Sequence, residues 1–290
     1  MCLILKHLTL ACALAWGLFI SGVPAQTAKP APQQPLPSTT TPPDIQVKAG
    51  NKTLIDDQLA EDAATKAAIE PYAAKVRELA QPIGQLSEDM KKFGVGGGTL
   101  GNLVTDAMRR QAAIELGHPV ILAVTNSSGL RKNEIKAGPL STMDIYELLP
   151  FENALVTLDL TGEQLRRFLD IVVARRDAQA GARILYRPDA AKKNIIVTVN
   201  LENADKTGVE INPASIYTIV TIDYLVKRGG SYALLQEGKN LKPLKLTLRD
   251  TVLAYIRGET AAGRAISAAR DGRFHYDNSP GAPKVPDEEP

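Results

Sequence analysis

Cysteine and histidine are scarce in this chain of 290 residues, and so are aromatic side chains. The only cysteines are Cys2 and Cys12, so the sequence beyond them offers neither a disulfide nor a thiolate ligand. Beyond the N-terminal segment the only histidines are His118 and His275, which lie far apart in sequence. This scarcity excludes most side-chain sets that bind zinc or use imidazole for acid–base catalysis.

The chain also lacks an excess of charge of either sign. It has 34 Lys and Arg residues against 32 Asp and Glu residues. Such a balance gives no electrostatic reason to bind nucleic acid or a membrane surface. The hydrophobic content of 44% is ordinary for a domain with a packed core.

The N-terminal segment, residues 1–25, is typical of a secretory signal peptide. Lys6 provides the positive start, residues 8–20 form a short apolar stretch, and Val23-Pro24-Ala25 is suited to cleavage. We therefore expect a secreted or periplasmic protein. Lipid attachment at Cys12 ranks second, because this cysteine falls inside the apolar stretch, and an uncleaved membrane anchor ranks third.

Residues 26–46 are proline-rich and are predicted to be a disordered linker, and residues 277–290 a disordered tail. Residues 47–276 are expected to form one domain. Helical and strand patterns are mixed without a strict βαβ rhythm, which favours the α+β (layered α/β) class, with mixed sheets packed against helices.

Local patterns predict the individual elements. Helices are expected over residues 62–80, with Pro71 starting a new turn or a kink, from residue 100, and from residue 248. Ser141 with Asp144, and Thr161 with Gln164, have the spacing of helix caps. Strands are predicted over residues 119–125 (buried), 154–160 (half-buried, with Val156, Leu158 and Leu160 on one face), 195–201 (with Ile195, Val197, Val199 and Leu201 on one face) and 217–222.

Gly96 to Gly101 match the pattern G-x-G-x-x-G. The residues before Gly96 do not read as a buried strand, and no acidic residue follows at the spacing of a dinucleotide-binding loop. We interpret the segment as a flexible lead into the following helix.

The turn from Asn126 to Arg131 directly follows the predicted buried strand, where ligands of α/β sheets bind. Gly129 permits backbone conformations closed to other residues, so the turn can approach a ligand closely. Arg131 offers a planar fork for phosphate or carboxylate. An arginine paired with a surface acid in a tight turn explains the same residues equally well.

Two aromatic residues are expected on exposed turns, Phe151 after Pro150 and Tyr232 after Gly229-Gly230-Ser231. Two such rings can sandwich a planar base. Taken alone, Phe151 is better explained as a core residue, and spacing does not decide whether the two rings meet.

Five segments, in this order, resemble the C-terminal domain of the 5′-nucleotidase / UDP-sugar hydrolase family. They are Leu100-Gly101-Asn102-Leu103-Val104-Thr105-Asp106-Ala107-Met108, the turn Asn126 to Arg131, Pro150 to Val156, Leu160-Thr161-Gly162 and Gly229 to Tyr232. The resemblance covers roughly residues 60–276. In that family this domain holds the substrate, while a separate N-terminal metallophosphoesterase domain binds two metals and performs the hydrolysis.

The resemblance implies a role for each matching residue. Asn126 and Arg131 would contact the phosphate or ribose end of a nucleotide, with Gly129 and Gly230 in the two binding turns. Phe151 and Tyr232 would stack on the base, and Asn153 would read its edge. The chain departs from the family pattern at three points. Ser127 and Ser128 replace two glycines of the family's turn, and the glycine-rich turn before Tyr232 is one residue shorter than in the family. The family also has an arginine just before the helix, where this chain has residues 94–98. Lys91 or Lys92 could replace that arginine only loosely.

The resemblance therefore predicts a secreted domain that binds a nucleotide or nucleoside. It would be the substrate-binding half of a split nucleotide phosphohydrolase, acting with a separately encoded metallophosphoesterase and inactive alone. Neither a cofactor nor a metal is expected in this chain, and nucleic acid is not an expected partner. The alternative is a stand-alone nucleotide-binding module, or a scaffold that binds no nucleotide.

Overall fold

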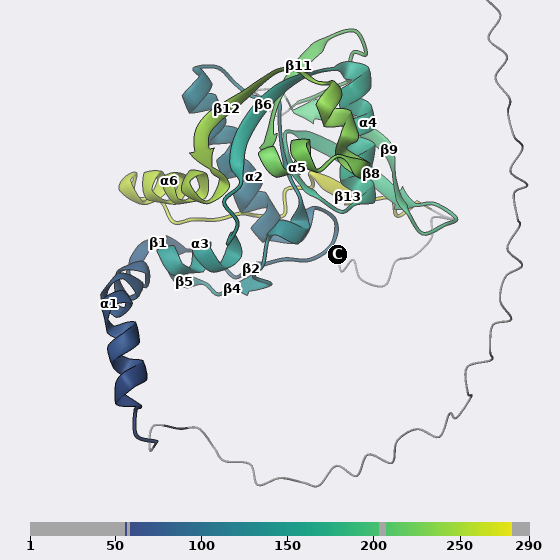
Figure 1. Ribbon diagram of the computed structural model, residues 1–290. Helices are drawn as coiled ribbons and strands as arrows, with labels where there is room; N and C mark the ends of the chain where they lie inside the picture. The colour runs from purple at the N-terminus through teal and green to yellow at the C-terminus, as the bar shows by residue number, and fades with distance from the viewer. Residues whose placement is uncertain (1–55, 57–58, 203–206, 280–290) are drawn as a thin grey trace, which may run out of the picture. The chain divides into compact units, whose positions relative to one another are not determined.

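The computed structural model describes residues 56, 59–202 and 207–279 (Figure 1). The expected signal segment, the linker 26–46 and residues 280–290 of the expected tail lie outside the described residues. The described residues from Glu61 onward belong to one compact unit. Residues 277–279, which were expected to belong to the tail, are among the described residues, and the backbone N–H of Asp277 donates to the Tyr186 carbonyl at 2.8 Å.

A five-stranded mixed sheet lies at the centre of this unit. Its strand order is β12 (Lys239–Thr247), β6 (Ala154–Thr161), β11 (Ile216–Ile222), β3 (Leu122–Thr125) and β7 (Ala178–Ala180). β11 and β3 run parallel, and the other neighbours are antiparallel. All four residues of β3 are buried, so this strand is covered on both faces.

A second sheet has the order β10 (Gly208–Val209), β9 (Asn194–Glu202), β8 (Ala182–Pro188) and β13 (Phe274–Tyr276). β8 and β13 are parallel, and the other pairs are antiparallel. Two short antiparallel pairs complete the strands, β1 (Pro82–Leu86) with β5 (Gly138–Ser141) and β2 (Met90–Lys91) with β4 (Glu134–Ile135). Mixed sheets packed with helices confirm the predicted fold class.

The helices are α1 (Ala63–Leu79), α2 (Gly98–Leu116), α3 (Thr142–Leu148), α4 (Gly162–Ala174), α5 (Asp223–Arg228) and α6 (Leu248–Ala261), and the 3₁₀ turns are η1 (Val95–Gly97), η2 (Ser127–Gly129) and η3 (Gly230–Glu237). α2 packs against β3, β7 and α6, and α4 against β6, β9 and η3. In Figure 1, α2 passes behind the long strands β6 and β12. α1 continues as one helix through Pro71 and has no buried residue.

Both predicted helix starts are confirmed as capping boxes. Ser141 and Asp144 bond to each other's backbone N–H at the start of α3, and Thr161 and Gln164 do the same at the start of α4. Each pair satisfies two backbone N–H groups that the first helical turn leaves without a partner. Behind the second cap, one face of α4, formed by Leu165, Phe168, Leu169 and Val172, is buried in the core.

Two strands differ from the burial pattern that the sequence predicts. β6 is buried on both faces instead of half-buried, because it lies between β12 and β11 and the helix α4 covers it. In β9 a register shift opposite Leu185 and Tyr186 turns Ile196 inward and leaves Ile195 and Val197 partly exposed. A bulge of this kind reverses which alternate side chains face the core.

The glycine-rich segment before α2 does lead into that helix, but it is packed tightly instead of being flexible. Val95, Gly96 and Gly97 are all buried. Gly96 has φ +87°, and a Cβ there would lie 2.5 Å from the Phe274 ring. The loop therefore needs glycine both for its backbone conformation and for space.

Candidate functional site

The predicted site residues gather at one edge of the five-stranded sheet. β3 and β11 end at this edge, because they are parallel, and their antiparallel neighbours β6 and β7 begin there. Asn126 therefore follows β3 at the same edge where Asn153 precedes β6. The backbone N–H of Ala154 donates to Asp223 Oδ1 at 3.0 Å, which ties the start of β6 to the end of β11. An edge at which parallel strands end is a common ligand position in α/β sheets.

The turn after β3 is fixed by hydrogen bonds to Arg176 and Asp177, which lie between α4 and β7. Ser127 donates its backbone N–H to Asp177 Oδ1 at 3.2 Å and its hydroxyl to the Arg176 carbonyl at 2.6 Å. Asn126 is buried, and its amide Nδ2 donates to Ser128 Oγ at 2.8 Å. Asn126 Oδ1 is also buried, and it finds no hydrogen-bond partner among the described residues. Because a buried acceptor without a partner is costly, this oxygen is suited to a donor from a ligand or a water molecule.

Gly129 is required for a different reason than the sequence suggested. Its φ is not positive, so the expected conformational freedom is not used. A Cβ at this position would instead lie 3.3 Å from Asn126 Nδ2, within tight contact. The glycine leaves room for the buried asparagine amide under the turn.

Arg131 and Phe151 meet at this edge, as the sequence argument required. The guanidinium carbon of Arg131 lies 5.9 Å from the centroid of the Phe151 ring, which is 48% exposed. Lys92 donates from Nζ to the Leu130 carbonyl at 2.8 Å. Burial and the neighbouring Arg131 charge lower the pKa of Lys92. An arginine beside an exposed ring, with a lysine near the arginine, is suited to a ligand that combines an anion with a flat apolar group.

Lys91, the other lysine considered from the sequence, is occupied elsewhere. Its Nζ lies 3.4 Å from Glu134 Oε1 in an exposed ion pair. Lys92 is thus the residue that supplies the second cation beside Arg131. Asn153 is half-buried at the same edge, and its carbonyl accepts from the backbone N–H of Leu248.

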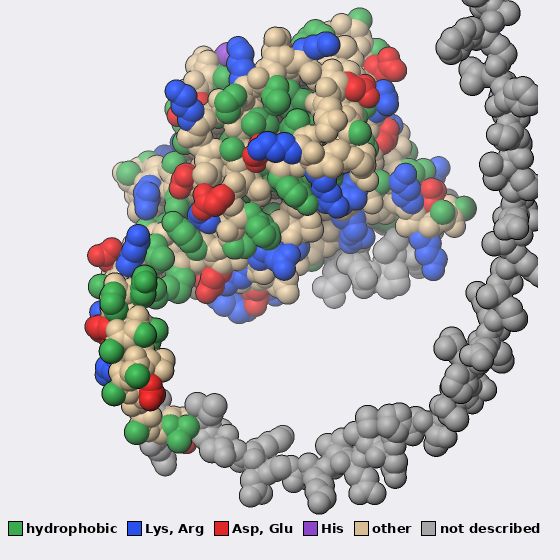
Figure 2. Space-filling view, viewed as in Figure 1, with side chains coloured by type: hydrophobic (Ala, Val, Ile, Leu, Met, Phe, Trp, Pro, Cys, Tyr) green, Lys and Arg blue, Asp and Glu red, His purple; other side chains and the backbone are tan. Residues whose placement is uncertain are grey.

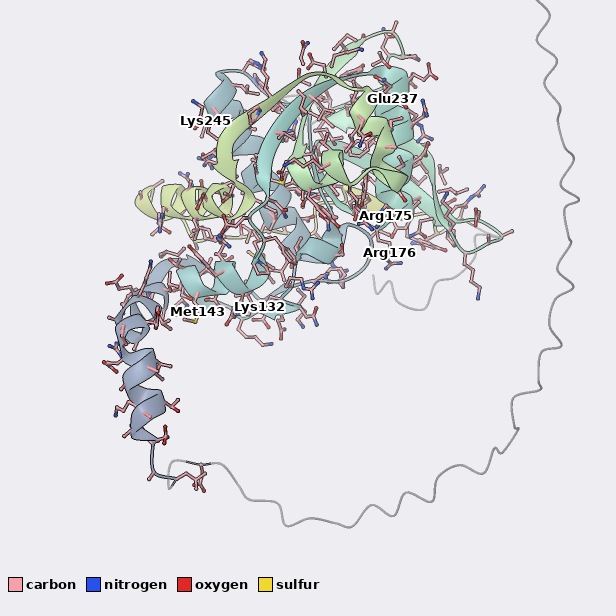
Figure 3. The ribbon with its side chains drawn as sticks, in the orientation of Figure 1. Lys132, Met143, Arg175, Arg176, Glu237 and Lys245 are labelled. Carbon is pink, nitrogen blue, oxygen red and sulfur yellow. The ribbon has the colours of Figure 1, made fainter. Side chains whose placement is uncertain are left out.

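The expectation that Tyr232 lies on an exposed turn is wrong, because the side chain is 0% exposed. Its hydroxyl donates to Asp177 Oδ2 at 2.5 Å and accepts from Arg175 Nε at 2.7 Å. The Arg175 guanidinium also covers the Tyr232 ring at 4.9 Å from its centroid. Figure 3 shows Arg175 and Arg176 where α4 ends. In this arrangement the ring does not face a ligand opposite Phe151.

Gly230 is likewise separate from the sheet-edge residues. It has φ +58° and lines an open depression together with Arg167, Asp170 and Glu237. None of the other residues predicted from the sequence lines that depression. The glycine-rich turn therefore forms the start of η3 and does not place Gly230 near Arg131.

An exposed aromatic residue that the sequence argument missed is Tyr224. It stands in the first turn of α5, two residues after β11 ends, and it is 42% exposed. The Arg228 guanidinium lies 5.7 Å from its ring centroid. The sequence contained a pattern that points to Tyr224, because this residue follows a strand predicted from residues 217–222 just as Asn126 follows the strand 119–125. The sheet edge thus carries two exposed rings, Phe151 and Tyr224.

A buried carboxylate, Asp177, connects the parts of this edge. It accepts from Tyr232 on η3 and from the backbone of Ser127 in the turn after β3. Burial raises the pKa of Asp177 to about 6, and its hydrogen bonds and the charges of Arg175 and Arg228 oppose this rise. Burial, together with the neighbouring Asp177, raises the pKa of the Tyr232 hydroxyl, which therefore stays protonated and donates.

The described part of the chain shows neither a candidate metal cluster nor a helix that could span a membrane. No group of three or more His, Cys, Asp or Glu side chains there is placed to hold a metal ion. Within the same residues, no helix is both long and apolar enough to cross a membrane. On the face shown in Figure 2, basic and acidic side chains are interspersed instead of forming one basic surface.

An α+β domain whose sheet edge gathers two cations, two exposed rings and a buried acceptor has the features of a ligand-holding domain. Residues 82–237 match the family model of the 5′-nucleotidase C-terminal domain. The match covers more than half of the chain, and the chain therefore belongs to this family.

Relatives of known function or structure match only over part of their length. The chain is 25% identical over 189 residues to a 5′-nucleotidase of Vibrio vulnificus, covering 63% of this chain and 32% of that protein. It is 26% identical over 206 residues to the endonuclease YhcR of Bacillus subtilis, covering 66% of this chain and 15% of the relative. The solved 5′-nucleotidase precursor of Thermus thermophilus matches with a TM-score of 0.64 and 25% identity, over 76% of this chain and 44% of that one. The chain thus spans less than half of these relatives.

Proposed function

We propose that this domain binds a nucleotide at the sheet edge. The observation that carries the proposal is the Arg131 guanidinium beside the exposed Phe151 ring, with Lys92 close enough to Arg131 for that charge to lower its pKa. The two cations hold the phosphate, and Phe151 stacks on one face of the base. Asn126 Oδ1 accepts a hydrogen bond from the ligand. These roles agree with a family named for nucleotide hydrolysis.

Tyr224 takes the place that the sequence argument gave to Tyr232. It is exposed at the same edge, whereas Tyr232 is enclosed by Asp177 and Arg175. Asn153 stands beside this edge and reads the rim of the base. The binding surface is therefore formed by the ends of β3 and β11 and the start of β6.

A thermal-shift titration with AMP tests the binding proposal. A ligand at a hundred times its Kd stabilises the folded state by about 2.7 kcal/mol, which raises the Tm by roughly 5–10 °C for a domain of this size. Arg131→Gln and Phe151→Ala are expected to abolish most of this shift. Arg257→Gln and Tyr72→Ala are matched controls, because both residues are exposed and lie on other elements, α6 and α1.

If AMP, adenosine and UDP-sugars all leave the wild-type Tm unchanged, the nucleotide site does not exist. The family fold would then serve as a scaffold. A shift that survives Phe151→Ala and disappears in Tyr232→Phe would place the site at η3 instead of the sheet edge.

For catalysis we propose a divided arrangement. This domain holds the substrate, and a metallophosphoesterase on a separate chain supplies the two metals and the hydrolysis. The support is the family membership together with the absence of a candidate metal cluster among the described residues. The N-terminal segment favours export, so the reaction would belong to nucleotide catabolism outside the cytoplasm.

Phosphate release from AMP by a cognate metallophosphoesterase tests the divided arrangement. Adding the wild-type chain is expected to increase the rate, and adding Phe151→Ala is expected not to. If the wild type binds AMP but leaves the rate unchanged, the divided arrangement fails while the binding proposal stands.

A further inference from the structure

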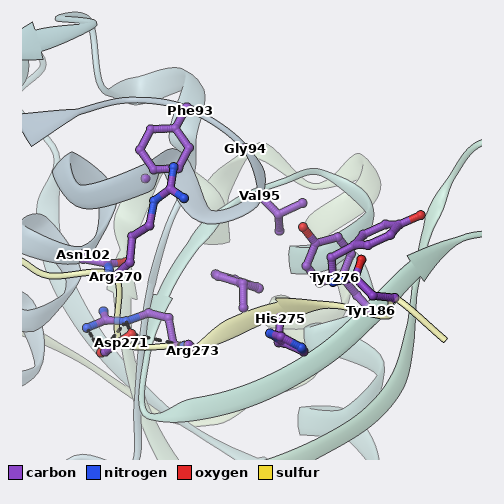
Figure 4. A pocket seen from close by; sticks show the side chains of 14 residues that line it. Phe93, Gly94, Val95, Asn102, Tyr186, Arg270, Asp271, Arg273, His275 and Tyr276 are labelled. Carbon is purple, nitrogen blue, oxygen red and sulfur yellow. Dashed lines mark hydrogen bonds and ion pairs between the residues drawn. The ribbon is translucent and has the colours of Figure 1, made fainter. Parts of the chain in front are cut away.

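A cavity of about 590 Å³ lies away from the sheet-edge residues, between the glycine-rich segment and the C-terminal strand (Figure 4). Its walls come from residues 93–95, from Gly98 and Asn102 on α2, from Tyr186 on β8, and from residues 270–276 and Asn278 around β13. Neither Arg131 nor Phe151 lines it. The volume falls within the range of small-molecule sites in proteins.

The glycine-rich segment separates this cavity from the turn after β3. A Cβ on Gly97 would point at Ser127 Oγ, 3.2 Å away, on the side of that turn. A Cβ on Gly96 would instead meet the Phe274 ring in the cavity wall. Successive residues of the segment thus face two different sites.

Aromatic rings form the apolar wall. Tyr186 meets Phe274 and Tyr276 edge to face, with ring centroids 6.4 and 5.7 Å apart. Phe93 stands at the opposite end, and the Arg270 guanidinium lies 4.1 Å from its ring centroid. Figure 4 shows Arg270 lying along Phe93, with Tyr186 and Tyr276 across the cavity. Such walls are suited to a flat aromatic group.

The wall is held in place before any ligand arrives. β13 pairs with β8, and the buried Arg273 bonds to Asp106 on α2 and Asp271 beside it. Asn102 Nδ2 donates to the Ala269 carbonyl at 3.0 Å, which fixes the start of the C-terminal segment. Little ordering is therefore needed on binding, which favours affinity.

The charge of the cavity favours an anion. Asp271 is engaged by Arg273, so its negative charge is offset within the wall. Arg270 brings a guanidinium to the other side. Gly98, the first residue of α2, also lines the cavity, and the first turn of this helix has neither an acidic residue nor a side-chain cap. The positive end of the helix dipole acts in the same direction as Arg270.

We infer that this cavity is a second ligand site, which binds a planar aromatic ring carrying an anionic group. The ring stacks among Phe93, Tyr186 and Phe274, and the anion lies at Arg270 and the start of α2. The ligand is a free aromatic acid or the base and phosphate of a second nucleotide. No residue of the cavity belongs to the proposed sheet-edge site, so the inference does not depend on it.

Isothermal titration of the full chain with 1-naphthoate tests the inference. We expect one saturable site, and weaker binding of the neutral isostere 1-naphthalenemethanol. Arg270→Gln is expected to weaken naphthoate roughly fivefold, as the loss of a partly exposed cation–π and ionic contact would. Arg270→Gln should leave the binding of the alcohol unchanged. Arg257→Gln, an exposed arginine on α6, is the matched control.

Asn278→Trp provides an independent check. Asn278 is exposed and lines the cavity, so an indole there fills the opening without disturbing the core. It is expected to abolish naphthoate binding with an unchanged Tm. Absence of wild-type binding at millimolar naphthoate and AMP, or binding unaffected by both variants, overturns the inference. Equal affinity for naphthoate and the neutral alcohol also overturns the inference, because it would show that the anionic group does not contribute to binding.

Titration with AMP distinguishes the two sources of the ligand. If the cavity takes nucleotides, Asn278→Trp removes one AMP site and Arg270→Gln weakens the same site, while Phe151→Ala removes the other or none. If it takes free aromatic acids, Asn278→Trp abolishes and Arg270→Gln weakens naphthoate binding, and both variants leave any AMP binding unchanged. Either result supports the second site.

Discussion

Replacing Tyr232 by phenylalanine separates its observed role in the core from the ligand contact that the sequence suggested. The substitution keeps the ring and removes only the hydroxyl. That hydroxyl donates to Asp177 Oδ2 and accepts from Arg175 Nε. If Tyr232 stacked on a base, the phenylalanine variant would bind and fold like the wild type.

The structure predicts a substantial loss of stability instead. A hydrogen bond to a charged group contributes about 1.5–3 kcal/mol, and Asp177 is nearly completely buried. Without the hydroxyl, the Asp177 carboxylate retains a hydrogen bond from the Ser127 N–H and an ion pair with Arg175, whose Nε lies 3.8 Å from Asp177 Oδ2. We therefore expect Tyr232→Phe to lower the free energy of unfolding by about 2–3 kcal/mol, and hence the Tm by roughly 4–10 °C.

Urea unfolding at pH 7.5 measures this change, with Tyr224→Phe as the matched control. Tyr224 is 42% exposed, so loss of its hydroxyl is expected to change the stability by less than about 0.5 kcal/mol. If Tyr232→Phe unfolds at the wild-type urea midpoint, the buried network around Asp177 does not stabilise the fold. A variant that loses AMP affinity while its stability is unchanged would restore Tyr232 to the binding surface.

Three other changes test the packing of the domain. Because the folded-state pKa of Asp177 is raised from 3.8 to about 6, the stability of the wild type relative to Asp177→Asn should fall as pH rises from 4 to 7, by roughly 2–2.5 kcal/mol in urea titrations; a constant difference would contradict the raised pKa. Gly96→Ala should cost about 1–3 kcal/mol more than Gly94→Ala in thermal unfolding, since both have positive φ but only Gly96 would press a Cβ on Phe274. Thr161→Ala should cost about 1 kcal/mol through loss of the α4 cap, and equal urea midpoints would refute that role.

Features that depend on neighbouring residues in the sequence were predicted correctly. The caps of α3 and α4 require only residues three positions apart, and the buried strand before Asn126 requires only a short apolar run. The meeting of Arg131 with Phe151 required more, namely that one strand ends where the other begins. The family resemblance supplied that information, because local spacing does not contain the strand order.

The errors arose where distant segments determine the surroundings of a residue. Ile196 faces inward in β9 because of a register shift opposite β8, which no pattern within β9 reveals. The glycine-rich segment looked flexible because Phe274, the ring packed against it, lies far along the chain. The exposure of a glycine-rich turn therefore has to be judged from what packs on it.

Tyr232 shows the same limit at the candidate site. Its surroundings are set by Arg175 and Asp177, on the segment between α4 and β7, more than fifty residues away. Asp177 also accepts a hydrogen bond from the Ser127 backbone N–H. The carboxylate that binds the Tyr232 hydroxyl therefore also fixes the turn that carries Arg131. A residue can thus serve a binding site by holding its turn in place without touching the ligand. Tyr232 is therefore a positioning residue for the proposed sheet-edge site, at which Phe151 and Tyr224 are the exposed rings.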